Sequence, residues 1–212
     1  LIVYLVLTYL SLFLWAIAPK FSLSLFLCIS LYHFGADWWP DQLFMRVITG
    51  SAVLLAPVIF YPQQSQAIFS ILTSSNYSIA PWIFIGWLSF IIYSLLAIRF
   101  LLKCPKYLYG EPFALILLAY CVSPLVYFTI YFCSLHSIRH YYYIWDNKII
   151  KYQHIKLLLI LWVVTLVITY CVHYYFTLIQ IDIMTLDSSY LKSIFITLFA
   201  LTVPHMLSME AI

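Results

Sequence analysis

The run "PWIFIGWLSFIIYSLLAIRFLL" (residues 81–102) contains a single charged side chain, that of Arg99. It is long enough to cross the hydrocarbon core of a bilayer as one α-helix, which needs roughly 20 apolar residues. The whole chain of 212 residues has the same character, with 66% hydrophobic and 8% charged residues, whereas soluble domains carry about a quarter charged residues. Because its apolar runs are continuous and do not alternate as barrel strands do, the sequence predicts an all-α integral membrane protein.

Further apolar runs extend this prediction to a polytopic helix bundle that forms a single transmembrane domain over residues 1–212. About seven spans are expected, at 1–18, 22–39, 43–61, 81–102, 113–144, 157–179 and 190–212. The segment 66–76 is too short to cross and is expected to be interfacial or re-entrant. The run 113–144 is longer than one span requires: either Pro124 kinks it, or its helix starts late and ends at the aromatic cluster Tyr141–Trp145. A net charge of +3 is too small to indicate a nucleic-acid partner.

Two histidines four residues apart lie in "YFCSLHSIRHYYYIW" (residues 131–145). On a helix, His136 and His140 share one face and are able to bind the same metal ion. The alternative is that both hydrogen-bond to neighbouring helices, but ionisable residues inside a membrane are costly and usually functional. Arg139 faces elsewhere, either reaching the interface or balancing a carboxylate. His154 lies in the basic loop "DNKIIKYQHIK" (146–156) and is predicted to be solvated.

Two more apolar segments carry a histidine. In "ISLYHFGADWW" (29–39), Asp37 follows His33 by four residues, where it either orients the imidazole or simply begins a loop. In "LFALTVPHMLSMEAI" (198–212), His205 follows a proline, and Glu210 is the one acid in this last span. Glu210 is either a partner of a metal-binding histidine or a residue of the helix end. Four neutral imidazoles suit iron, zinc or copper better than magnesium or calcium, and the spacing leaves the metal open.

The ordered set "YHFGADWW", "YFCSLHSIRH" and "LTVPHMLSME" resembles the Brp/Blh family of membrane-bound bacterial and archaeal β-carotene 15,15′-dioxygenases. The resemblance implies cleavage of β-carotene by O₂ into two retinals at a non-haem Fe²⁺ site. It implies metal binding by His33, His136 and His140, and it matches His205 to a conserved histidine that we include as a fourth candidate ligand. It also implies a multi-pass protein of a prokaryotic inner membrane, surrounded by lipid and functionally linked to a retinal-binding rhodopsin.

One family motif, an N-terminal Pro-His-Gly, has no match here, and the chain starts at Leu1 inside an apolar run. We therefore expect a natural N-terminal segment to precede it. Two other functions stay open from the residues alone. Histidines on separate helices are able to clamp a haem in an electron-transfer protein. Another iron-dependent lipid oxygenase or desaturase is the second alternative, although a di-iron desaturase needs several histidine boxes and only one HxxxH occurs here.

Overall fold

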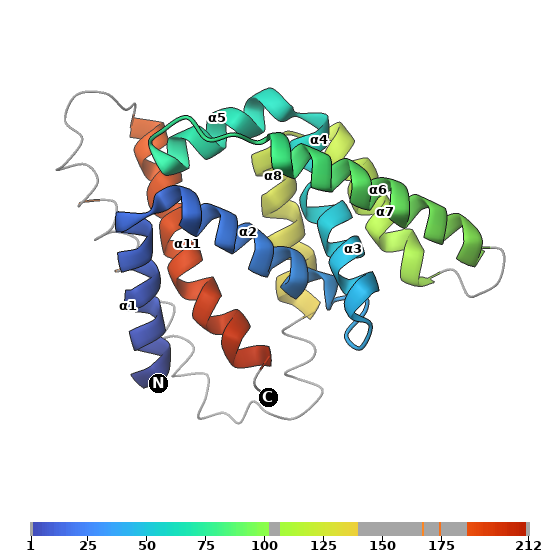
Figure 1. Cartoon of the computed structure of the whole chain (residues 1–212), viewed down its shortest axis with the longest axis horizontal. Coiled ribbons are helices and arrows are strands. Elements are labelled where there is room, and N and C mark those ends of the chain that lie inside the picture. The colour runs from blue at the N-terminus through green and yellow to red at the C-terminus, as the bar shows by residue number, and fades with distance from the viewer. Residues whose placement is uncertain (1, 102–106, 140–166, 168–173, 175–185, 211–212) are drawn as a thin grey trace. The chain divides into compact units, whose positions relative to one another are not determined.

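A computed structural model of the protein describes residues 2–101, 107–139, 167, 174 and 186–210 (Figure 1). Its elements are α1 (Ile2–Ile17), α2 (Pro19–Gly35), α3 (Leu43–Leu54), α4 (Ala56–Phe60), α5 (Pro62–Thr73), α6 (Ala80–Leu101), α7 (Tyr107–Cys121), α8 (Pro124–Thr129), the π-helix η1 (Ile130–His136) and α11 (Leu186–Glu210). Within these residues there is no strand, so the all-α class is confirmed for the described part of the chain.

The predicted spans correspond to these helices with two interruptions. The run 43–61 is divided at Leu55 into α3 and α4, and the run 113–144 is interrupted just before Pro124, as expected. The short segment 66–76 falls mostly in α5, and the span 157–179 lies outside the described residues except at Val167 and Tyr174. In the part of the chain that the structure describes, α6 alone is long and apolar enough to cross a bilayer. The number of seven spans therefore remains a prediction.

Prolines determine where many of these helices begin. A proline occupies the first or second position of five helices: α2, α4, α5, α6 and α8. Proline suits this place because its ring presets a helical φ and because the first N–H groups of a helix have no partner inside the helix. The same chemistry breaks the two long runs, since proline has no N–H to donate to the carbonyl four residues before it.

Two tyrosine hydroxyls bond to the carbonyls that these prolines leave without their usual donor. Pro57 is four residues after Val53, and the Tyr127 hydroxyl donates to the Val53 carbonyl at 2.8 Å in a buried position. Pro124 is four residues after Tyr120, and the Tyr61 hydroxyl donates to the Tyr120 carbonyl at 2.8 Å. In an apolar environment an unpaired carbonyl is costly, so these tyrosines make the breaks in the helices tolerable.

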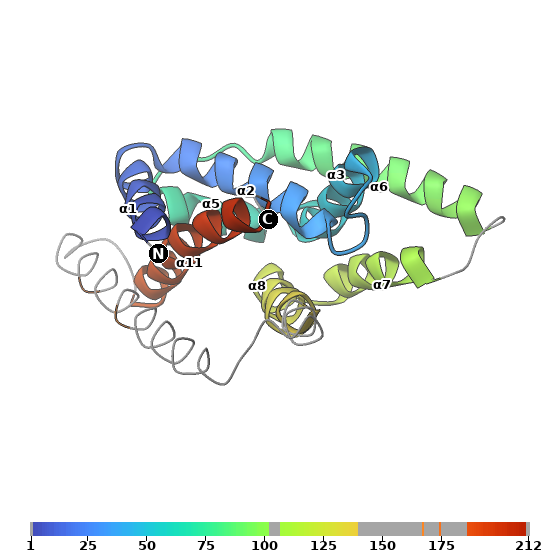
Figure 2. The same ribbon diagram turned by 90° about the horizontal axis from the view of Figure 1, so that it is seen from below.

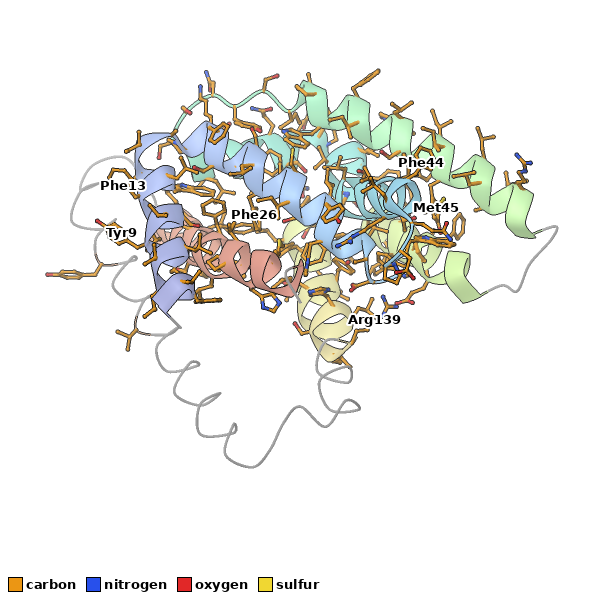
Figure 3. The ribbon with its side chains drawn as sticks, turned by 60° about the horizontal axis from the view of Figure 1, so that its bottom comes forward. Tyr9, Phe13, Phe26, Phe44, Met45 and Arg139 are labelled. Atoms are coloured by element: carbon orange, nitrogen blue, oxygen red, sulfur yellow. The ribbon has the colours of Figure 1, made fainter. Side chains whose placement is uncertain are left out.

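The chain forms two compact units. The first contains Leu1–Phe26, Ser70–Ser75 and Tyr143–Ile212, and the second contains Leu27–Phe69 and Asn76–Tyr142. In the first unit, α1 lies beside α11 in both ribbon views (Figure 1, Figure 2). Trp15 packs edge-on against Phe199 with ring centroids 4.9 Å apart. Tyr9 and Phe13 project from the opposite side of α1 (Figure 3) and are 68% and 54% exposed.

In the second unit, two glycines allow α2 and α3 to cross with their backbones in contact. A Cβ atom on Gly35 would lie 1.8 Å from the Arg46 carbonyl oxygen, and one on Gly50 would lie 1.9 Å from the Leu31 carbonyl oxygen. Small residues at helix crossings are typical of helices that pack in membranes. The buried Arg46 side chain then turns back to α2, where its Nε donates to the Tyr32 carbonyl at 2.9 Å. This crossing fixes the C-terminal end of α2, where the candidate site begins.

Candidate functional site

The site lies in the second unit, where the end of α2 meets η1. His33 is in the last turn of α2, and the chain then tightens into a turn in which the Asp37 N–H donates to the Phe34 carbonyl at 3.2 Å. Bonds of this i→i+3 kind satisfy carbonyls that the end of a helix leaves open. The turn holds Asp37 beside the helix end rather than in a free loop.

Asp37 pairs with His136, a contact that the spacing between His33 and Asp37 did not predict. The Nδ1 atom of His136 lies 3.0 Å from Oδ2 of Asp37, and the two side chains are 11% and 14% exposed. An ionised carboxylate only accepts hydrogen bonds, so this contact favours the imidazole tautomer that carries its proton on Nδ1. In that tautomer the other ring nitrogen, Nε2, keeps its lone pair, which is the form of histidine that binds a metal.

The π-helix explains why Tyr131 and His136 both reach Asp37. The Tyr131 hydroxyl lies 3.5 Å from the same Oδ2 atom that His136 contacts. The two residues are five apart, and in an α-helix they would point about 140° away from each other. In a π-helix the hydrogen bonds run from i to i+5, so residues five apart share a face. No residue type marks a π-helix, so the sequence did not predict this element. π-helical turns are often found at functional sites.

A second ionic contact holds Asp37 from the other side. The Arg139 guanidinium, labelled in Figure 3, lies 3.8 Å from Oδ2 of Asp37 and donates to the carboxylate of Glu111 on α7. It also lies over the Trp38 ring, 5.3 Å from the centroid. The expectation that Arg139 balances a carboxylate is confirmed. Glu111 was missed, although an arginine in an apolar chain with seven acidic residues signals that one of them is its partner.

Aromatic rings enclose the imidazole of His136. Phe34 approaches it edge-on at 4.7 Å between centroids, and Phe132 stacks on it at 6.0 Å. Phe34 and Tyr131 are 1% and 0% exposed. Such surroundings lower the local dielectric constant, which strengthens the hydrogen bond between Asp37 and His136 and makes an unpaired polar group costly.

The structure brings three of the six predicted site residues together. The rings of His33 and His136 lie 5.3 Å apart, with Asp37 beside them. His140 lies outside the described residues, as does the side chain of Glu210, while His205 belongs to α11 in the first unit. Within the described ranges, no group of three or more histidine, cysteine or acidic residues has an arrangement that could hold a metal ion.

Comparison with known proteins concerns the chain as a whole. The sequence model of a family described as beta-carotene 15,15′-dioxygenase matches residues 1–212. A protein named beta-carotene 15,15′-dioxygenase, from uncultured marine bacterium 66A03, is 32% identical over 230 aligned positions, which cover 100% of this chain and 79% of that protein. No solved structure matches the chain.

Proposed function

Because this chain belongs to the β-carotene 15,15′-dioxygenase family and is thus a carotenoid-cleaving dioxygenase, we propose that it uses O₂ to cleave the central double bond of β-carotene. Each half of the substrate becomes one retinal, and the two oxygen atoms of O₂ end in the two aldehydes. The observation that supports this best is the family match over the whole chain. Membership in this family favours the carotenoid enzyme over the haem and desaturase alternatives.

The proposed cofactor is a non-haem Fe²⁺ ion held by His33, His136, His140 and His205. One distance in the structure supports the assignment of His33 and His136. A metal–nitrogen bond of about 2.1 Å places an ion about 3.2 Å from the centre of an imidazole, so two rings on one ion lie at most about 6.4 Å apart. The rings of His33 and His136 lie 5.3 Å apart. Because Nδ1 of His136 is hydrogen-bonded to Asp37, Nε2 is the nitrogen left to bind the metal. Neutral imidazole is a suitable ligand for iron.

The chain's own residues have two roles in this proposal. His33 and His136 bind the ion, which when bound supplies a centre for O₂ chemistry. Phe34, Phe132 and Tyr131 pack around the His136 imidazole and the Asp37 carboxylate and keep water from the site. No proton has to be given to or taken from the carotenoid, so an absence of paired catalytic carboxylates is compatible with the reaction.

We also propose that the enzyme is embedded in a prokaryotic inner membrane as a multi-pass protein. The α6 span, Ala80–Arg99, is only 28% buried, unlike the core helix of a soluble protein. Its exposed apolar side chains recur every three or four residues, which gives one continuous stripe: Phe84, Trp87, Leu88, Ile91, Leu95 and Ile98. Lipid is the solvent that such a stripe suits, and it is also where β-carotene dissolves. A retinal-binding rhodopsin is the proposed user of the product.

The test is to express the full-length protein in cells that accumulate β-carotene and to measure retinal by chromatography. We expect loss of colour and about two retinals for each β-carotene consumed. His33→Ala and His136→Ala are expected to abolish retinal formation and to lower iron content without loss of protein from the membrane. His154→Ala is the matched control, since sequence analysis places this histidine in a solvated loop. Retained colour without retinal, despite membrane expression, would refute the proposed function.

A further inference from the structure

We propose that Asp37, Arg139 and Glu111 are positioning residues that fix the orientation and the tautomer of His136. The inference rests on the proposed function, because it concerns how the chain prepares one iron ligand. It adds a chain of contacts that runs from Glu111 on α7 through Arg139 and Asp37 to the imidazole: a hydrogen bond between Glu111 and Arg139, an ion pair between Arg139 and Asp37, and a hydrogen bond between Asp37 and His136. None of these three side chains is required to touch iron or substrate.

The first link is the bond between Asp37 and His136. At 3.0 Å between Oδ2 and Nδ1, the carboxylate selects the tautomer in which Nδ1 is protonated. Phe34 and Phe132 limit rotation of the ring from two directions, edge-on and stacked. The contact with the carboxylate therefore favours Nε2 as the nitrogen that binds iron, and the aromatic rings set the direction in which Nε2 points.

The second link keeps the carboxylate itself in place. Oδ2 of Asp37 receives three groups: the His136 ring at 3.0 Å, the Tyr131 hydroxyl at 3.5 Å and the Arg139 guanidinium at 3.8 Å. Arg139 is anchored at its other end by Glu111. Arg139 lies between the two carboxylates and attracts both, so it holds the Asp37 carboxylate in place without displacing its bond to the histidine.

The test uses purified protein in detergent and four variants: Asp37→Asn, Glu111→Gln, the double variant, and the matched control Asp41→Asn. Asp41 is an exposed acid four residues after Asp37, so its substitution removes the same charge from the same loop between α2 and α3. Two properties are measured besides retinal formation. One is the dissociation constant for Fe²⁺. The other is the ring ¹⁵N spectrum of His136 in metal-free protein, assigned with His136→Gln.

We expect the wild-type spectrum to show a protonated Nδ1 and an unprotonated Nε2. Asp37→Asn is expected to give a mixed or reversed tautomer, because an amide is able to donate as well as accept, and to weaken Fe²⁺ binding 10- to 100-fold. Glu111→Gln is expected to shift the His136 tautomer in the same direction and to weaken Fe²⁺ binding by less than tenfold. If Glu111 acts only through Asp37, the double variant will match Asp37→Asn.

Three outcomes overturn the inference. An unchanged His136 spectrum and iron affinity in Asp37→Asn would remove Asp37 from this role while leaving the proposed function intact. A wild-type spectrum in Glu111→Gln, or additive losses in the double variant, would show that Glu111 and Arg139 do not position His136 through Asp37. A wild-type protein that forms retinal but binds no iron would overturn the inference together with the proposed metal site. The metal-free spectrum of Asp37→Asn reports on the tautomer in every case, including one in which the variant is inactive.

Discussion

Substitution of Gly35 by alanine should disrupt the crossing of α2 and α3. The added Cβ would lie 1.8 Å from the Arg46 carbonyl oxygen and 2.6 Å from its carbonyl carbon. Ordinary carbon–oxygen contacts are about 3.3 Å or longer, so the two backbones must separate by about 1.5 Å. Both obstructing atoms are backbone, and no side-chain rotation relieves the overlap. Overpacking of this kind typically costs 1–3 kcal/mol, and we expect a loss of about 3 kcal/mol in the free energy of unfolding.

The assay is unfolding in mixed micelles with increasing sodium dodecyl sulfate, followed by circular dichroism. Gly110→Ala is the matched control, because a Cβ at this helical position meets no atom within 4 Å. It should raise stability by about 0.5–1 kcal/mol, the usual gain when alanine replaces glycine in a helix. Gly35 lies between His33 and Asp37, so its substitution should also lower retinal formation. If Gly35→Ala is as stable as Gly110→Ala, the close crossing is wrong.

Two other predictions concern the interrupted helices. Tyr127→Phe removes the buried donor to the Val53 carbonyl and should cost about 1–3 kcal/mol in the same assay. The loss should shrink in a Pro57→Ala background, where an N–H is restored four residues after Val53; equal losses in both backgrounds would contradict this. Insertion of one alanine after Ser134 should place Tyr131 and His136 six residues apart, about 120° from each other around an α-helix. Retinal formation should be lost while the helical circular dichroism remains, and an active insertion variant would refute the role of this register.

Sequence periodicity predicted the helices well because continuous apolar runs have few alternatives. The break before Pro124 and the short helix around 66–76 followed directly from proline chemistry and segment length. The break at Leu55 was missed, although Pro57 carries the same signal. A proline at the second position of a new helix is easily taken for a kink within one span, since both leave the same carbonyl open.

The site was harder to predict because its contacts join distant segments. His33 and His136 were identified as members of one set, and their rings do lie together. The spacing offered Asp37 either as a partner of His33 or as the start of a loop, and it gave no sign of the contact with His136, because the helix ends at Gly35. Beyond a helix end the i, i+4 rule no longer applies, and Asp37 is free to face another element. Glu111 is 28 residues from Arg139, and no periodicity connects them.

Three departures from regular helix geometry converge on the same few side chains. Gly35 ends α2 and allows its close approach to α3, the following turn presents Asp37, and η1 places Tyr131 and His136 on one face. The turn and η1 are each less favourable by themselves than a continued α-helix, because regular helical hydrogen bonds are given up and π-helical turns are rare. Close helix packing by itself explains Gly35, but neither the turn at Asp37 nor the π-helix. Their coincidence at His33, Asp37 and His136 is therefore better explained by selection for a site than by selection for stability. The same reasoning predicts that regularising any one of the three will disturb the others, since all three meet at the Asp37 carboxylate or at the turn that carries it.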